Sequence, residues 1–285
     1  MREAMRDARR RLTPIYGRGE TEAILRLAFH YLKGWNPTDM AIHEADTLSD
    51  YTRGRLDEIC GRLEKGEPIQ YITSDAYFYG MHLRVEPGVL IPRPETEDLI
   101  DAILDRTERR PDLDVLDIGT GSGAIAIALA RNLPFSRVEG VDISEKALEV
   151  ARANAQTLRA DVVFRRADIF SWAPQARSLD IIVSNPPYVD ESEREGMEAN
   201  VLDYEPAGAL FVPDSDPLRY YRRIAAIGVD ALRPGGMLAF EINPRHETGM
   251  TRLLETDYTD VEIIRDRFGR SRIAICKLPA NASEI

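Results

Sequence analysis

The sequence has few cysteines and few histidines. Among its 285 residues are two cysteines, Cys60 and Cys276, and four histidines. The cysteines lie far apart and suggest no disulfide framework, and their scarcity is typical of proteins in the reducing cytosol. The four histidines show no paired spacing of the kind that holds zinc. We therefore expect neither a disulfide scaffold nor a bound metal.

Long apolar runs are missing as well. The longest run near the middle of the chain, AIAIALA at 124–130, is far shorter than the roughly 20 residues that a membrane helix needs. The N-terminal segment MREAMRDARRRL contains no apolar stretch that could act as a secretory signal. The sequence therefore predicts a soluble, cytoplasmic protein with no membrane partner.

Positive charge is not in excess either. The formal net charge is −11, which argues weakly against a partner held mainly through phosphate contacts, because such proteins usually carry a basic surface. Five arginines between residues 2 and 11 are an exception. The favoured interpretation of these arginines is a solvated helix face, and a contact with an acidic or nucleic-acid partner is the alternative. Signatures of serine hydrolases and of P-loop proteins do not occur.

Three regions of the chain differ in their pattern of apolar residues. Residues 1–75 repeat apolar residues at helical spacing, as between 24 and 32, and are expected to form a small helical domain. Residues 76–91 alternate with a period of two and break at Pro87-Gly88, which indicates a β-hairpin linker. From residue 92 to residue 285 strands and helices alternate, which indicates a separate α/β domain.

The alternating region predicts a Rossmann-like α/β fold. Helices are expected at 121–132, 144–158 and 216–232, and strands at 113–118, 137–143, 161–169, 179–185, 235–243, 261–266 and 271–278. Such alternation is typical of a mostly parallel sheet with helices on both faces. The link between the last two strands is too short for a crossover helix, so they should pair antiparallel. We thus expect a seven-stranded, mostly parallel sheet with an antiparallel C-terminal strand.

A glycine-rich loop, DIGTGSGA at 117–124, joins the first strand of this region to its first helix. Gly119, Gly121 and Gly123 would let the backbone turn sharply and let a ligand approach it closely. Asp142, at the end of the next strand, could accept hydrogen bonds from ribose hydroxyls. The loop fits the dinucleotide fingerprint and also the first motif of methyltransferases that bind S-adenosylmethionine. Taken alone, it leaves NAD and S-adenosylmethionine open.

The segment DIIVSNPPYVD at 180–190 ends a buried strand in an amide, two prolines and an aromatic ring. The carboxyl ends of parallel strands meet at one edge of a sheet, so this segment should lie near the glycine loop. The side-chain oxygen of Asn185 and the carbonyl of Pro186 can accept the N–H bonds of a planar amide and stabilise charge that develops on its nitrogen. Pro186 and Pro187 fix the backbone, and Tyr188 offers a flat face. Asn-Pro-Pro-Tyr resembles the substrate-amine motif of methyltransferases that act on planar nitrogens, and this resemblance implies methyl transfer and hence S-adenosylmethionine.

Several further segments resemble the release factor glutamine methyltransferases, the HemK/PrmC family. They are GEPIQYI at 66–72, LIPRPETEDL at 90–99, DIGTGSGAIAIALA at 117–130, YEPAGAL at 204–210, LRPGGMLAFEI at 232–242 and RDRFGRSR at 265–272. The resemblance covers nearly the whole chain. It implies methylation of the side-chain nitrogen N5 of the glutamine in the Gly-Gly-Gln motif of peptide-chain release factors, with S-adenosylhomocysteine as the second product. It also implies that the N-terminal helical domain recognises this substrate.

The same resemblance assigns residues to the site. Those that bind the cofactor are Gly119, Thr120, Gly121, Ser122, Gly123, Asp142, Ile169 and Asn185, and those that hold the substrate amide for catalysis are Asn185, Pro186, Pro187 and Tyr188. Arg93, Thr96 and Glu97 either border the site or only begin a helix. Asn243 and His246 depart from the family, whose members often carry glycine and glutamine there, and neither is assigned a role.

Two other functions remain as alternatives. Adenine-N6 methyltransferases acting on DNA or RNA share Asn-Pro-Pro-Tyr, but the acidic balance of this chain and the lack of an evident basic recognition domain count against direct nucleic-acid binding. A module that binds the cofactor without catalysis is the second alternative, and the intact Asn-Pro-Pro-Tyr segment counts against it.

Overall fold

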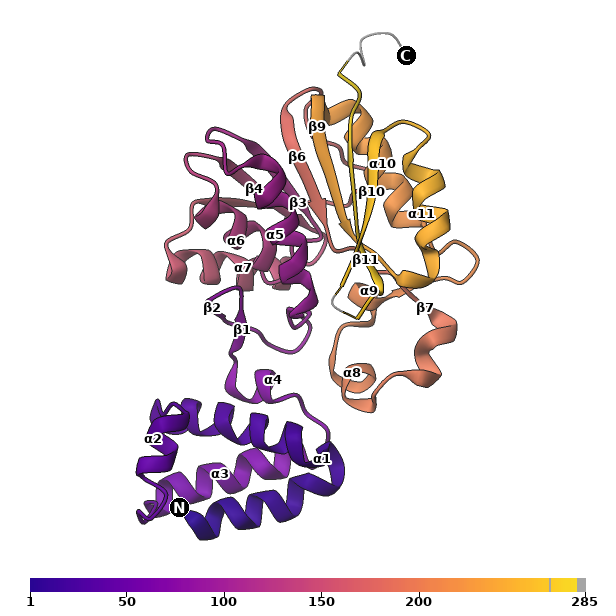
Figure 1. The fold of residues 1–285 in the computed structure, drawn as a ribbon. Coiled ribbons are helices and arrows are strands. Elements are labelled where there is room, and N and C mark those ends of the chain that lie inside the picture. The colour runs from indigo at the N-terminus through magenta and orange to yellow at the C-terminus, as the bar shows by residue number, and fades with distance from the viewer. Residues whose placement is uncertain (267, 281–285) are drawn as a thin grey trace. The chain divides into compact units, whose positions relative to one another are not determined.

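The computed structural model describes residues 1–266 and 268–280, so Arg267 of the RDRFGRSR segment lies outside the described residues. The chain forms two compact units (Figure 1). One comprises residues 1–75 and 198–204, and the other comprises the rest of the described chain. Within the described ranges, no helix combines the length and the apolar character needed to cross a bilayer.

Helices alone build the first unit. They are α1 (Arg2–Lys33), α2 (Pro37–Ile42), α3 (Asp50–Leu63), α4 (Ile69–Thr73) and, from later in the chain, α8 (Ala199–Tyr204). Apolar side chains of α1, α3 and α4, among them Phe29 and Ile59, share one buried core. Gly17 interrupts α1 with a φ of 72° and a ψ of 167°. Glycine reaches this backbone conformation at low cost, so the two halves of α1 can change direction there.

A seven-stranded sheet forms the centre of the second unit. Its strands are β3 (Asp114–Ile118), β4 (Arg137–Asp142), β5 (Val162–Arg166), β6 (Leu179–Ser184), β9 (Leu232–Glu241), β10 (Thr259–Arg265) and β11 (Ser271–Lys277). They lie in the order β10-β11-β9-β6-β3-β4-β5, and β11 runs antiparallel to both of its neighbours. The other neighbouring pairs are parallel. The predicted fold class is confirmed, as is the antiparallel pairing of the last two strands.

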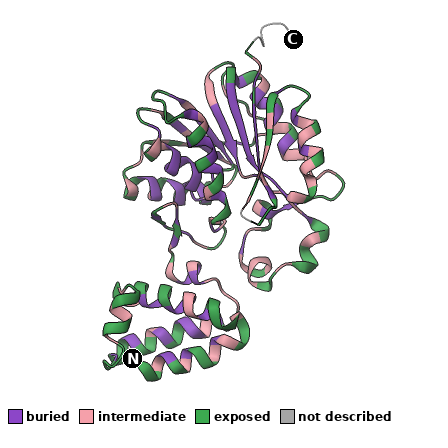
Figure 2. Cartoon of the chain, in the orientation of Figure 1, coloured by how far each residue is buried: buried purple, intermediate pink, exposed green. Residues whose placement is uncertain are grey.

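Helices cover both faces of this sheet (Figure 1). They are α5 (Glu95–Thr107), α6 (Ala124–Asn132) and α7 (Glu145–Leu158) on one face, and α10 (Arg219–Ala231) and α11 (Glu247–Leu254) on the other. Successive side chains of a strand point to opposite faces. On β6, Ile181 and Val183 therefore join the core beneath α5 and α6, whereas Ile182 joins the core beneath α10 and α11. Figure 2 shows the central strands of this sheet buried and the outer helix faces exposed.

Smaller elements complete the second unit. They are the antiparallel strands β1 (Ala76–Phe78) and β2 (Met81–Leu83), the parallel strands β7 (Val189–Asp190) and β8 (Phe211–Val212), the helix α9 (Ala207–Leu210), and the 3₁₀ turns η1 (Glu191–Gly196) and η2 (Pro244–His246). Tyr79 and Gly80 connect β1 to β2 with φ values of 47° and 73°. Two positive φ values fit the tight turn that suits the twist of a hairpin.

Several elements differ from the sequence prediction. The helix α11 was not predicted, since its eight residues are too few for its periodicity to stand out, and the short elements α8, α9, β7 and β8 were not predicted either. Helix α5 begins at Glu95, where the start of a helix was one of two interpretations of Arg93, Thr96 and Glu97. Strand β5 ends at Arg166 rather than at 169. Asp168 starts a turn there, since its carboxylate accepts from the backbone N–H of Phe170 at 3.0 Å and its carbonyl accepts from that of Trp172 at 2.8 Å.

Candidate active site

A cavity of about 490 Å³ lies where β3, β4, β5 and β6 end. This volume falls within the range of small-molecule sites. The loops after these strands supply most of its wall, and residues 88–96, residues 206–209 and α10 supply further parts. The lining includes Gly119, Thr120, Gly121, Ser122, Asp142, Asp168, Ile169, Asn185, Pro186 and Pro187. Parallel strands thus bring residues that are distant in the sequence to one place.

The glycine loop leaves its backbone accessible on the cavity side. Gly119, Gly121 and Gly123 have φ values of 74°, 55° and 82°, a region that favours glycine. A Cβ atom added to Gly119 or Gly121 would meet no atom within 4 Å. Gly123 is different, because an added Cβ would lie 3.0 Å from Ile127 and 3.1 Å from Ala151, and Gly123 is not among the described residues that line the cavity. Gly123 allows α6 and its surroundings to pack closely.

Asp142 ends β4 and holds the glycine loop in place. Its Oδ2 accepts a hydrogen bond from the backbone N–H of Gly121, and its Oδ1 accepts one from Ser144, each at 2.9 Å. Burial raises the pKa of Asp142, and the backbone donors oppose that rise. Each carboxylate oxygen can accept a further hydrogen bond. Asp142 can therefore bind ligand hydroxyls while it braces the loop.

Asp117 lies buried at the start of the same loop. Its Oδ2 accepts from the hydroxyl of Thr120 at 2.6 Å and from the backbone N–H of Ala126 at 3.2 Å, whereas its Oδ1 has no hydrogen-bond partner within the described part of the chain. Burial raises the pKa of Asp117 to about 7, although both donors oppose the rise. A cation bound nearby would favour the charged form. In the sequence, Asp117 stood out only as the first residue of the glycine motif.

The side chain of Asn185 is oriented by two residues from other segments. Its Nδ2 donates to Oε2 of Glu241 at 3.0 Å and to the hydroxyl of Thr96 at 3.3 Å. Because the amide nitrogen is engaged by these acceptors, the amide oxygen remains available as an acceptor. Asn185 lines the cavity, so the side chain can present that oxygen to a bound amide.

Glu241 is the common acceptor of this arrangement, and sequence reasoning assigned it no role. It ends β9 and is 1% exposed. Its Oε2 also accepts from the hydroxyl of Thr96 at 2.5 Å, and its Oε1 accepts from the hydroxyl of Tyr188 at 2.8 Å. Burial raises the pKa of Glu241, and the Thr96 and Tyr188 donors and the nearby Arg272 oppose the rise. An acidic residue at the end of the buried strand MLAFE was the signal available in the sequence.

Two of the residues considered in the sequence are not among the described residues that line the cavity. Tyr188 is not among the described residues that line the cavity, and its hydroxyl is directed to Glu241. A contact between the ring of Tyr188 and the substrate therefore remains a prediction. Glu97 is also outside the lining, and its Oε1 accepts from the backbone N–H of Tyr79 at 2.7 Å. Arg93 and Thr96 do line the cavity, and α5 begins between them at Glu95.

The segments LIPRPETEDL and YEPAGAL meet at one wall of the cavity. Glu205, whose side chain is 1% exposed, pairs with the guanidinium of Arg93 and also accepts from the backbone N–H of Ile91 at 3.2 Å. Pro92 and Pro206, next to these groups in the sequence, both line the cavity. The buried carboxylate thus fixes two loops that share a wall.

Asn243 and His246 contact the segment that follows Pro187. The Nδ2 of Asn243 donates to the backbone carbonyl of Tyr188 at 3.1 Å and to Glu193 at 2.7 Å. The Nε2 of His246 lies 2.8 Å from the carboxylate of Asp190. Asn243 thus contacts Tyr188 of the Asn-Pro-Pro-Tyr segment, and His246 contacts Asp190 two residues after it.

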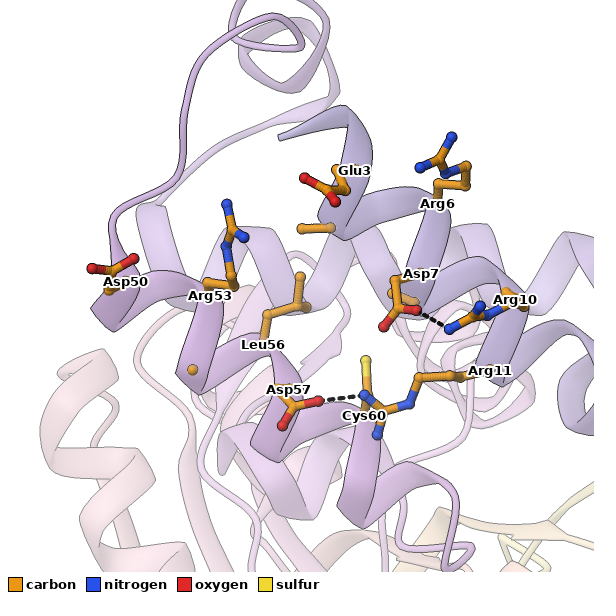
Figure 3. Close-up of a pocket in the computed structure, with 13 residues that line it drawn as sticks. Glu3, Arg6, Asp7, Arg10, Arg11, Asp50, Arg53, Leu56, Asp57 and Cys60 are labelled. Carbon is orange, nitrogen blue, oxygen red and sulfur yellow. Dashed lines mark hydrogen bonds and ion pairs between the residues drawn. The ribbon is translucent and has the colours of Figure 1, made fainter.

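A second cavity, of about 700 Å³, lies within the helical unit between α1 and α3 (Figure 3). Its charged lining residues are Arg6, Arg10, Arg11, Arg53, Glu3, Asp7, Asp50 and Asp57. Ion pairs join Arg10 to Asp7 and Arg11 to Asp57 (Figure 3). Positive and negative side chains are thus balanced, so the cavity favours no ligand of one sign.

Comparison with known proteins places this chain in a family. Residues 3–73 match the PrmC N-terminal domain, and residues 96–203 match the methyltransferase small domain. A release factor glutamine methyltransferase of Bacteroides thetaiotaomicron is 51% identical over 268 residues, which cover 93% of this chain and 95% of that protein. The chain belongs to the release factor glutamine methyltransferase family. The enzyme of that name from Streptococcus pneumoniae is 39% identical over 261 residues, which cover 90% of this chain and 92% of that protein.

Solved structures show the same fold as this release factor glutamine methyltransferase. The T. thermophilus 16S rRNA N2 G1207 methyltransferase, in complex with AdoMet and guanosine, has a TM-score of 0.53 at 20% identity, and the match covers 72% of this chain and 49% of that one. A methyltransferase from Pyrococcus furiosus has a TM-score of 0.50 at 18% identity, with coverages of 76% and 96%. At these identities the likeness concerns the fold alone. The family predicted from the sequence motifs is confirmed.

Proposed function

We propose that this enzyme transfers a methyl group from S-adenosylmethionine to the side-chain nitrogen N5 of the glutamine in the Gly-Gly-Gln motif of peptide-chain release factors, in the cytoplasm. S-adenosylhomocysteine is the second product, and the amide nitrogen releases one proton, which balances the positive charge of the sulfonium. The observation that carries the proposal is the amide oxygen of Asn185, which is left available as an acceptor beside a cavity that Asp142 and the glycine loop also line. Membership of the family supports the choice of a protein glutamine as the acceptor.

The cavity suits an adenosine-containing cofactor. The exposed backbone at Gly119 and Gly121 lets a ligand approach without meeting a side chain. Asp142 keeps lone pairs for the two ribose hydroxyls. Ile169 and Ile143, on the loops after β5 and β4, add apolar wall on which an adenine could pack. When bound, S-adenosylmethionine supplies a methyl group that is already activated on a sulfonium.

The residues of the chain hold the acceptor amide and stabilise its change of charge. An amide nitrogen is a poor nucleophile because its lone pair is delocalised into the carbonyl. The oxygen of Asn185 and the carbonyl of Pro186 would accept the two N–H bonds and fix the nitrogen in line with the methyl group. The same oxygens stabilise the positive charge that grows on the nitrogen during transfer. The prolines set this geometry in advance, because each fixes its own φ near −65°.

The remaining parts of the chain have proposed roles as well. Residues 1–75 recognise the release factor, residues 76–91 serve as a β-hairpin linker, and residues 92–285 form the methyltransferase domain. The match of residues 3–73 to the PrmC N-terminal domain supports the first of these assignments. The arginines near the N-terminus are no evidence for a nucleic-acid partner, because Arg9 pairs with Glu22 and Arg11 pairs with Asp57 and Glu64.

A comparison of acceptors tests the proposal. The enzyme is incubated with cofactor that carries a labelled methyl group and, in parallel, with a release factor, with DNA and with RNA. We expect label in the release factor alone. Label in nucleic acid but not in the release factor would overturn the proposal in favour of an adenine-N6 methyltransferase. The Asn185→Ala variant, prepared in the same way, controls for contaminating methyltransferases.

A further inference from the structure

The buried carboxylate of Glu241 is close to the proposed acceptor site but does not line it. It receives hydrogen bonds from Thr96 on α5, from Asn185 after β6 and from Tyr188 on the same loop. A carboxylate offers only acceptors. Oε2 of Glu241 therefore requires a donor from Asn185, and only the amide nitrogen of Asn185 can donate. If the Asn185 amide were turned around, its oxygen would lie 3.0 Å from the carboxylate oxygen.

We propose that Glu241 is a positioning residue that selects a glutamine amide over a glutamate carboxylate by fixing which end of the Asn185 side chain faces the substrate. The proposal rests on the proposed function of the site. With the nitrogen of Asn185 directed to Glu241, the oxygen is presented to the acceptor. An oxygen accepts from the N–H of a glutamine side chain and repels the carboxylate of a glutamate.

The surroundings of Glu241 favour this orientation of the Asn185 amide over the opposite one. Thr96 alone could not impose it, because a hydroxyl donates as readily as it accepts and would tolerate either orientation of the Asn185 amide. Burial raises the pKa of Glu241, but the hydroxyls of Thr96 and Tyr188 donate to its two oxygens and Arg272 lies nearby, and all three favour the ionised carboxylate, which cannot donate. Tyr188 binds the other carboxylate oxygen and keeps the group from rotating. Burial also raises the pKa of Tyr188, so its hydroxyl stays a donor.

The Glu241→Gln variant tests the proposal with almost no change in shape. A glutamine at this position offers an oxygen at one end and an NH₂ group at the other, so it accepts Asn185 in either orientation. One of these orientations presents the Asn185 nitrogen to the cavity, where it would bind a carboxylate. A release factor whose motif glutamine is changed to glutamate should therefore inhibit the variant at least fivefold more strongly than it inhibits the wild-type enzyme.

The control is Asp190→Asn, the same chemical change in another buried acid of the loop. Asp190 pairs with His246 and makes no hydrogen bond to Asn185. Its substitution should leave inhibition by the glutamate form unchanged. A general loosening of the loop would weaken inhibition in both variants. Stronger inhibition of Glu241→Gln alone is the expected result, and unchanged or weaker inhibition of Glu241→Gln overturns the proposal.

A reciprocal exchange gives a second, independent readout. In Asn185→Asp the new carboxylate faces Glu241, and the transfer rate should be low. In the double variant Asn185→Asp with Glu241→Gln, the amide introduced at position 241 donates to the carboxylate introduced at position 185, so the repulsion between the two positions is relieved while an acceptor oxygen still faces the cavity. Single-turnover transfer by the double variant should be at least tenfold faster than by Asn185→Asp alone. Additive losses would contradict the proposed coupling.

The proposed function and this inference fail in different ways. If wild-type enzyme does not label the release factor, the proposed function is wrong. If the wild-type enzyme labels it, while Glu241→Gln shows no gain in inhibition by the glutamate form, the proposed function stands and the role given to Glu241 is wrong. Calorimetric cofactor binding by each variant shows that the methyltransferase unit is folded in the same samples.

Discussion

Replacing Asn185 by alanine should slow methyl transfer far more than it weakens cofactor binding. The substitution removes the oxygen that would stabilise positive charge on the acceptor nitrogen. By analogy with the loss of one donor from an oxyanion hole, the rate of the chemical step should fall roughly 10²–10³-fold, or about 3–4 kcal/mol. The glycine loop and Asp142 are untouched, so cofactor affinity should change by less than about tenfold.

The structure also indicates that Asn185→Ala lowers the stability of the protein, which could not be inferred from the sequence. Asn185 donates to the buried carboxylate of Glu241 at 3.0 Å, and a hydrogen bond to a charged group contributes on the order of 1.5–3 kcal/mol. Thr96 and Tyr188 still donate to Glu241 in the variant, which offsets part of that loss. We expect the free energy of unfolding to fall by about 1–2 kcal/mol, too little to unfold the protein at 25 °C.

Rapid-quench single-turnover transfer, calorimetric cofactor binding and urea unfolding measure these three quantities on the same preparations. Transfer at the wild-type rate with cofactor and release factor both saturating would refute the role given to Asn185. The Asn-Pro-Pro-Tyr segment would then be only a rigid end of β6. A loss of affinity as large as the loss of rate would instead place Asn185 in cofactor binding.

Three further predictions concern the residues around the site. Asp142→Ala should weaken cofactor binding by about 1.5–3 kcal/mol, and unchanged affinity in calorimetry would remove Asp142 from the site. Burial raises the pKa of Asp117 to about 7, well above the value of about 3.9 in an unfolded chain. The native state therefore binds this proton more tightly, so the stability from Asp117 is complete below about pH 4 and is lost as the pH rises through 7. Between pH 5 and pH 8, the free energy of unfolding measured in urea should fall more for wild type than for Asp117→Asn, by roughly 2 kcal/mol. Equal falls would contradict the raised pKa of Asp117. Glu205→Ala should lower the free energy of unfolding by about 2 kcal/mol, since it leaves the backbone N–H of Ile91 without its acceptor; a loss below about 0.5 kcal/mol would place Glu205 with ordinary surface residues.

The fold could be predicted because its signals are local. The apolar strand before Gly119 and the run AIAIALA after it gave β3 and α6 with errors of a few residues at their ends. Asn185 was found in the same way, since a strand that stops in Asn-Pro-Pro-Tyr is a feature of one short segment. Placement of these residues at one sheet edge followed from the alternation of strands and helices.

The partners of these residues could not be predicted, because they are far away in the sequence. Asn185 is 56 residues from Glu241 and 89 from Thr96, and Ile91 is 114 residues from Glu205. No periodicity or spacing connects such pairs, which depend on how the loops pack against one another. The hydrogen bond from the hydroxyl of Tyr188 to the buried Glu241 could not be predicted for the same reason.

The central claim is that the nitrogen N5 of a release factor glutamine receives the methyl group. Tandem mass spectrometry of the release factor after reaction with S-adenosylmethionine tests it most directly, because fragment ions locate the methyl group on one residue. We predict one added methyl group on the side chain of the Gly-Gly-Gln glutamine, and none on a release factor in which that glutamine is changed to glutamate. A methyl group on any other residue, or equal methylation of the glutamate form, would contradict the account.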